Sequence, residues 1–84
     1  MGNRMVKYKR TYLQYFGYSK QDFIPCELCG AQAVDIHHIE NRKQRKDLEN
    51  DINNLMALCR ECHLEYGDKK RHKEWLKIKH KELL

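Results

Sequence analysis

The sequence has no apolar run long enough to cross a membrane and no apolar segment behind its basic start. A transmembrane helix needs about 20 consecutive apolar residues, and a secretory signal peptide needs a shorter apolar core. Internal repeats and low-complexity segments are absent as well. We therefore expect one domain over residues 1–84, in a cytoplasmic protein that is neither secreted nor bound to a membrane.

The chain is also short for a stable hydrophobic core, and small domains usually add disulfides, a metal or a partner. Its four cysteines form two Cys-x-x-Cys pairs, Cys26 with Cys29 and Cys59 with Cys62. In a reducing compartment, paired motifs of this kind are metal ligands before they are disulfides. A redox Cys-x-x-Cys is the alternative, but it does not explain two copies. The pattern predicts one structural zinc ion held by four thiolates.

The segment between the two cysteine pairs is longer than the loop of an ordinary zinc ribbon. Residues 33–39 predict a strand with Val34 and Ile36 on one face, and residues 55–58 predict a second short strand. Residues 40–53 are highly charged and predict an exposed loop. A zinc ion at the cysteines would pin the start of this insert to its end.

Helices are predicted on both sides of the insert. In residues 6–17, Tyr8, Tyr12, Tyr15 and Phe16 follow helical spacing, and Gly17 stands where a C-cap would fall. That spacing favours a core role for the tyrosines over stacking on bases.

On the other side of the insert, a helix is expected from about residue 60 to 66. A basic helix over residues 68–84 follows, with Asp68 as its N-cap and with apolar surface from Trp75, Leu76, Ile78 and Leu83. His72 and His80 are expected to be ordinary histidines of this helix, either on its surface or satisfied by hydrogen bonds within the fold.

Three histidines near the cysteines are not needed by a four-cysteine zinc site. Adjacent residues on a helix point about 100° apart, so His63 can face away from the zinc that Cys62 binds. His37 on the first strand could meet His63 there, and the pair would leave a metal open to water and phosphate oxygens. His38 remains as a base, because a neutral imidazole with a pKa near 6.5 can take a proton from water.

His37 and His38 would point to opposite faces of a regular strand. For both to serve one site, the strand must bend or end beside them. Asn54 could hold such a bend by hydrogen-bonding the backbone. Asp35 lies two residues before His37 and could support a ligand histidine. The equally strong alternative is that Asp35 is a solvent-facing strand carboxylate.

The motifs Cys-x-x-Cys, Asp-Ile-His-His-Ile and Asn-Leu-Met-Ala-Leu-Cys-x-x-Cys-His occur in this order over residues 26–63. Together they resemble the HNH endonucleases, which have a ββα-metal fold stapled by a zinc ribbon. The resemblance implies a small α+β fold: a ββα-metal (His-Me finger) core at residues 26–66, stapled by a four-cysteine zinc site and flanked by the N-terminal and C-terminal helices.

The same resemblance implies a role for each polar residue of the insert. His38 matches the general base, and His37 and His63 match the ligands of the catalytic metal. Asn54 matches the central asparagine that orients the loop and the base. The implied catalytic metal is one divalent cation, usually Mg²⁺, for which Mn²⁺, Ni²⁺ or Zn²⁺ can substitute.

The charge of the chain favours a polyanionic partner. Lys and Arg number 17 against 12 Asp and Glu, which gives a net charge of +5. With a nuclease site nearby, we expect phosphate contacts from the loop and the final helix, although these cations could simply solvate the surface. The candidates are Arg42, Lys43, Arg45, Lys46, Lys69, Lys70 and Arg71.

The predicted function is therefore metal-dependent nicking or cutting of DNA. A non-catalytic zinc-finger adaptor is the alternative, but such a module has no use for the three histidines. A degenerate HNH domain is a third hypothesis, against which the intact residues argue. One compact site cuts one strand, so double-strand cutting would need a dimer, a larger protein machine or two events. A small HNH protein of this kind is typical of phage packaging, restriction or mobile-element systems, with phage or bacterial origin favoured.

Overall fold

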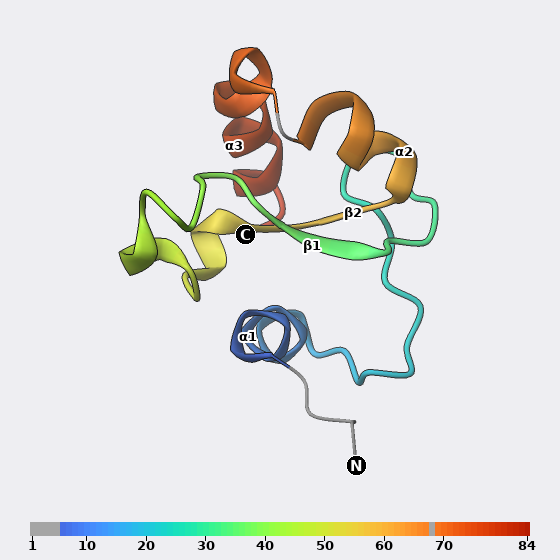
Figure 1. The fold of residues 1–84 in the computed structure, drawn as a ribbon. Coiled ribbons are helices and arrows are strands. Elements are labelled where there is room, and N and C mark those ends of the chain that lie inside the picture. Colours follow the sequence, from blue (N-terminus) through green and yellow to red (C-terminus); the bar gives the residue numbers. More distant parts are fainter. Residues whose placement is uncertain (1–5, 68) are drawn as a thin grey trace.

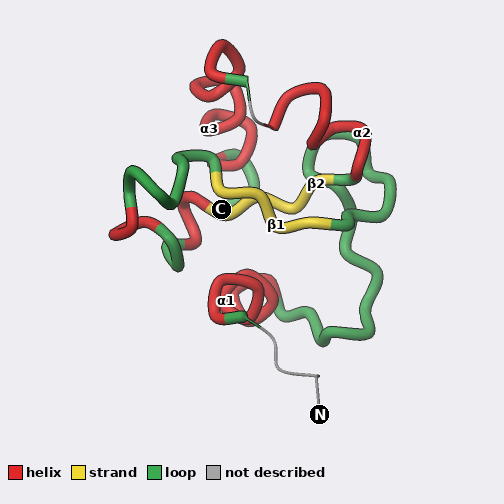
Figure 2. Tube along the Cα trace, in the orientation of Figure 1, coloured by secondary structure: helices red, strands yellow, loops and turns green. Residues whose placement is uncertain are grey.

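The computed structural model describes residues 6–67 and 69–84, which fold around a two-stranded antiparallel sheet (Figure 1). Helix α1 lies on one side of the sheet, and α2 and α3 lie on the other (Figure 2). This is the small α+β architecture that the sequence predicted. The elements are α1 (Lys7–Phe16), β1 (Asp35–His38), β2 (Leu55–Leu58), α2 (Arg60–Cys62) and α3 (Lys73–Lys81).

Strand β2 is buried on both faces. Leu55 and Ala57 pack toward Tyr12 of α1, whereas Met56 and Leu58 pack toward Leu76 of α3. All four strand residues have 0% exposure. Because both faces are covered, the strand is a continuous apolar run and not an alternating one.

Helix α1 ends at Phe16, and Gly17 adopts the left-handed conformation (φ 76°) that the sequence predicted for its C-cap. Its buried face differs from the expected one. Tyr12 and Leu13 are buried, whereas Tyr15 is 50% exposed. The helix therefore packs through a stripe that is rotated toward Leu13, away from Tyr15.

Strand β1 is shorter than predicted and begins at Asp35. Val34 precedes it and stays 60% exposed, so the apolar face expected from Val34 and Ile36 rests on Ile36 alone. The loop after β1 is largely exposed, as predicted, but it contains two 3₁₀ turns, Lys46–Leu48 and Ile52–Asn54.

The chain after the second cysteine pair turns twice. Helix α2 continues into a wide turn, His63–Gly67, and a 3₁₀ turn, Lys70–His72, leads into α3. Helix α3 therefore starts later than predicted, and Asp68, the expected N-cap, lies outside the described residues. In the part of the chain that the structure describes, no helix is long and apolar enough to cross a membrane.

Of the two alternatives for His80, the structure shows the hydrogen-bonded one within the fold and not the surface one. His80 is 1% exposed; its Nδ1 donates to Glu27 Oε1 at 2.7 Å and its Nε2 donates to the Ile52 carbonyl at 2.7 Å. The second carboxylate oxygen of Glu27 accepts from the Tyr12 hydroxyl at 2.5 Å and from the Ala57 N–H at 3.1 Å. Glu27 thus joins α1, α3 and the sheet at one point.

This buried network fixes the charge of His80. Burial alone would lower the pKa of His80, but the hydrogen bonds to Glu27 and to the Ile52 carbonyl raise it above its usual value. Because both ring nitrogens face acceptors, the imidazole holds two protons and pairs with the carboxylate as a cation. A position in a lysine-rich helix gave no sign of this role.

Candidate functional site

The four cysteines come together as the sequence predicted. Their sulfur atoms all lie within 4.8 Å of one another, and Cys29 Sγ is 3.6 Å from Cys59 Sγ. A tetrahedral zinc with Zn–S bonds of about 2.3 Å separates its sulfur ligands by about 3.8 Å. The donor set and its spacing therefore fit one zinc ion.

The backbone around Cys26 favours its thiolate form. The N–H of Leu28 points at Cys26 Sγ and the N–H of Cys62 at Cys59 Sγ, both at 3.4 Å. Burial raises the pKa of Cys26, but backbone hydrogen bonds outweigh it and lower that pKa to about 7. The first turn closes at Gly30, which adopts a positive φ of 83°. Thiolate is the form that binds a metal.

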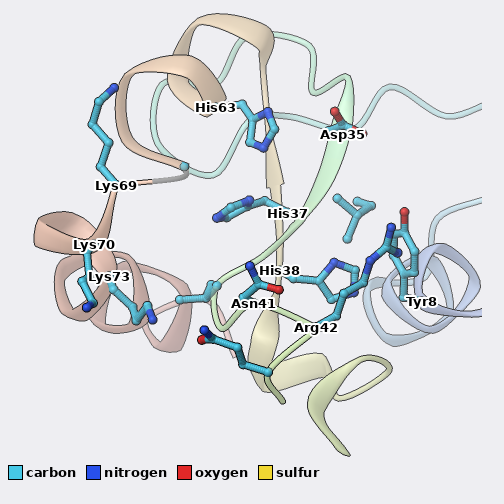
Figure 3. A pocket seen from close by; sticks show the side chains of 14 residues that line it. Tyr8, Asp35, His37, His38, Asn41, Arg42, His63, Lys69, Lys70 and Lys73 are labelled. Atoms are coloured by element: carbon cyan, nitrogen blue, oxygen red, sulfur yellow. The ribbon is translucent and has the colours of Figure 1, made fainter. Parts of the chain in front are cut away.

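A pocket beside β1 contains all three histidines that the sequence singled out (Figure 3). His37 and His38 come from the strand, and His63 comes from the turn after α2. Further polar and aromatic side chains line the pocket, among them Tyr8, Asp35, Asn41, Arg42, Lys69, Lys70 and Lys73.

His37 and His63 face one another in this pocket. Their ring centroids are 4.9 Å apart at an interplanar angle of 66°, and His37 is 7% exposed. His63 follows Cys62 directly, and its N–H bonds to the Cys59 carbonyl at 2.9 Å. The cysteine cluster thus sets the position of one of the two imidazoles. Two imidazole donors fit a metal whose remaining positions are open to water and substrate.

Gly67 lines the pocket directly beside the His37 and His63 rings. A Cβ atom at this position would lie 2.6 Å from His63 Cδ2 and 3.4 Å from His37 Cε1. The first distance is far below van der Waals contact, so any side chain at this position would displace the His63 ring. Glycine is therefore required here for space, because the backbone passes directly behind the ring.

His38 is held by a backbone carbonyl. Its Nε2 lies 2.9 Å from the Glu49 carbonyl oxygen, which can only accept, so Nε2 carries the proton and Nδ1 keeps a free lone pair. Burial and the nearby charge of Arg42 lower the pKa of His38 and outweigh the opposite effect of Glu49. Strand β1 ends at His38 and the chain bends after it, which allows histidines from opposite strand faces to line one pocket.

Asn54 stabilises the bend after β1 through side-chain hydrogen bonds to the backbone. It is 4% exposed, and its Oδ1 accepts from the Glu40 N–H at 2.6 Å. Its Nδ2 donates to the carbonyls of Glu40 and Leu48, both at 3.2 Å. The side chain therefore ties the end of β1 to the loop that carries Glu49, the partner of His38.

The predicted phosphate-contacting cations divide into two groups. Arg42, Lys69 and Lys70 line the pocket; Lys43, Arg45, Lys46 and Arg71 do not. Arg45 pairs with Asp47 at 3.0 Å.

Two of the lysines at the pocket are already engaged. Lys69 donates to the carbonyls of Leu64 and Glu65 at 2.7 and 3.1 Å. Lys73, which sequence reasoning missed, lines the pocket too and pairs with Glu40 at 3.2 Å. Its spacing of three and four residues from Lys70 and Lys69 was the available signal.

Tyr8 packs against the core cluster beneath α1, as its helical spacing predicted. Its second role was missed: its ring also lies against His38, with the ring centroids 4.4 Å apart, and it lines the pocket.

Comparisons with known proteins agree with this geometry. A family model described as HNH endonuclease matches residues 26–69, slightly more than half of the chain. A mitochondrial DNA mismatch repair protein, a mutS homolog from Sarcophyton glaucum, is 42% identical over 53 residues; the match covers 57% of this chain and 5% of that protein. No solved structure matches the chain.

Proposed function

The chain belongs to the HNH endonuclease family, and from that premise we propose that it hydrolyses phosphodiester bonds of DNA with the help of a divalent metal ion. The observation that carries the proposal is the meeting of three histidines and several cations in one pocket beside the cysteine cluster. The similar protein from Sarcophyton glaucum is named for DNA mismatch repair, which supports DNA as the substrate.

We assign the four cysteines to a structural zinc ion and the histidine pair to the catalytic metal. His37 and His63 would hold one divalent cation, Mg²⁺ in the simplest case. A cation bound there supplies positive charge against the scissile phosphate and the departing 3′ oxygen. Asp35 lines the same pocket, and we propose that its carboxylate supports the ligand histidines.

His38 acts as the general base in this proposal. With Nε2 committed to the Glu49 carbonyl, Nδ1 takes a proton from water as the water oxygen bonds to phosphorus. The bond between phosphorus and the 3′ oxygen breaks, and that oxygen takes a proton from solvent. The products carry a 5′ phosphate and a 3′ hydroxyl. The lowered pKa of His38 keeps the imidazole neutral, and so able to act, at pH 7.

Substrate phosphates would be held by cations of the pocket. Lys69 and Lys73 already bond protein oxygens, so we assign the main phosphate contacts to Arg42 and Lys70. Such contacts position the DNA without reading its sequence. Asn54 serves as a positioning residue, because it fixes the bend that presents His38 and the loop that carries Glu49.

Both flanking helices belong to this functional unit in our proposal. Tyr12 and His80 bond the same Glu27 carboxylate inside the first cysteine pair, so residues 1–84 would form one nuclease domain.

The test is incubation of zinc-loaded protein with supercoiled plasmid in the presence of Mg²⁺, Mn²⁺ or EDTA. We expect nicking with a divalent ion and none with EDTA. Tight binding without cleavage in any divalent ion would instead identify a non-catalytic zinc-finger adaptor. The basic pocket and the cysteine cluster would serve such an adaptor equally well.

A further inference from the structure

Tyr8 enters the pocket from outside the segment that matches the family model. It lies in the first turn of α1, whereas the matching segment begins at residue 26. The helix is fixed one turn further on, where Tyr12 is 2% exposed and bonds Glu27. The backbone that carries Tyr8 is therefore anchored to the zinc-binding segment.

One aromatic ring contacts two functional groups of the site. The Tyr8 and His38 rings meet edge to face, with centroids 4.4 Å apart and an interplanar angle of 69°. The Arg42 guanidinium carbon lies 5.5 Å from the Tyr8 ring centroid. These are the favourable geometries for an aromatic pair and for a cation over a π face. Figure 3 shows Tyr8, His38 and Arg42 grouped at one end of the pocket.

The contact with Tyr8 restrains a motion of the His38 ring that the hydrogen bond to the Glu49 carbonyl leaves free. A single bond from Nε2 to the Glu49 carbonyl holds His38 at one point, and the ring can still swing about it. The Tyr8 ring blocks that motion on one side.

We propose that Tyr8 is a positioning residue for the nuclease reaction, one that holds both His38 and Arg42 in their working places. Helix α1 is then part of the active site and more than a cover for the sheet. This inference rests on the proposed function, since it assigns Tyr8 a task through the proposed base.

The kinetic test compares substitutions at Tyr8 with the same substitution at Tyr15. Tyr15 lies on the same helix, is 50% exposed and does not line the pocket, so Tyr15→Leu is the matched control. Tyr8→Leu and Tyr8→Gln remove the ring and keep good helix formers. We expect both to lower kcat for plasmid nicking by about ten- to a hundred-fold, as a misplaced reacting group does. Tyr8→Phe keeps the ring and should cleave like wild type, as should Tyr15→Leu.

A spectroscopic test does not depend on cleavage. The His38 ring lies 4.4 Å from the Tyr8 ring, centroid to centroid, so the Tyr8 ring current shifts the NMR signal of its Cε1 proton. That signal can be assigned from the peak that His38→Ala removes. We expect this signal to shift in Tyr8→Leu and to stay in place in Tyr15→Leu. A change in kcat that exceeds the change in KM, together with rescue by Tyr8→Phe, separates positioning from a general loss of structure.

The outcomes distinguish this inference from the proposed function. If wild type fails to cut with any divalent ion, the proposed function fails. If wild type cuts and folded Tyr8→Leu or Tyr8→Gln cuts at the wild-type rate, the inference is wrong and the nuclease assignment stands. A Tyr8→Phe variant as slow as Tyr8→Leu, or an unshifted His38 signal in Tyr8→Leu, would overturn the inference as well.

Discussion

His37 and His38 are neighbours in the sequence but have different surroundings. His37 faces His63 at a ring distance of 4.9 Å, and His38 is held by the Glu49 carbonyl and the Tyr8 ring. The end of β1 beside them lets a single dipeptide supply the proposed metal ligand and the proposed base to one pocket. At the scale of residues, we therefore expect metal binding to respond both to removal of a ligand and to a change in the residues packed around it.

Removing His63 should weaken the catalytic metal and spare the zinc. In His63→Ala the four cysteine sulfurs keep their arrangement, because the zinc site does not use the imidazole. We expect one zinc per chain by elemental analysis and a much higher Mg²⁺ concentration for half-maximal nicking. Loss of the zinc in this variant would mean that His63 helps to bind the zinc, and that the cysteines and the histidines form a single metal site.

Gly67→Ala should impair the same metal site by steric means. The added methyl group would lie 2.6 Å from His63 Cδ2, so the ring must move. Disturbing the surroundings of a metal ligand commonly costs about 10- to 100-fold in metal affinity, and we expect a loss of that size in a Mn²⁺ titration of nicking. An unchanged titration curve, in a variant that melts like wild type, would contradict this geometry.

At the scale of elements, Glu27 connects two helices and a strand through hydrogen bonds to its carboxylate. Its carboxylate takes hydrogen bonds from α1, β2 and α3 at once, through Tyr12, Ala57 and His80. Breaking a buried ion pair by removal of one partner commonly costs about 3–5 kcal/mol. We expect His80→Leu to lower the free energy of unfolding by an amount near the bottom of that range, measured by urea denaturation at pH 6.

The same pair predicts the direction of a pH effect on stability. The pKa of His80 is raised in the folded state, so its contribution is fully present below the ordinary value of about 6.5. The contribution is lost as pH rises through the folded-state value. The stability difference between wild type and His80→Leu should therefore shrink from pH 6 toward alkaline pH. A constant difference across that range would contradict the charged state assigned to His80.

Sequence reasoning succeeded where a signal is local. Gly17 marked the end of a helix, the apolar run at β2 marked a strand, and the cysteine spacing marked one metal site. It failed where partners lie far apart in the chain. His80 finds Glu27 across 53 positions, and a histidine among lysines gave no hint of burial. For Tyr8, helical spacing correctly predicted the core contact, but it could not show that the same ring also lines the pocket.

At the scale of the whole molecule, the proposed function uses two metal sites: the four-cysteine zinc site and, within and just past the segment that it encloses, the proposed catalytic metal site. The cysteines bracket the insert that carries His37 and His38, and His63 follows the last cysteine. The zinc site should therefore be a condition for catalysis without taking part in it. Stripping the zinc with a thiol-compatible chelator, followed by excess Mg²⁺, should leave no nicking activity, and adding zinc back should restore it. Full nicking activity in protein shown to be zinc-free would mean that catalysis does not depend on the zinc site, and it would contradict this prediction.

The central claim is that His38 activates the water that cuts DNA. The most direct test is the rate of plasmid nicking by zinc-loaded His38→Ala beside wild type, at saturating Mg²⁺ and at equal protein concentration. General-base catalysis contributes about 10²- to 10⁴-fold, so we predict a loss of that size with zinc content and melting temperature unchanged. A His38→Ala protein that nicks plasmid at the wild-type rate would contradict the account.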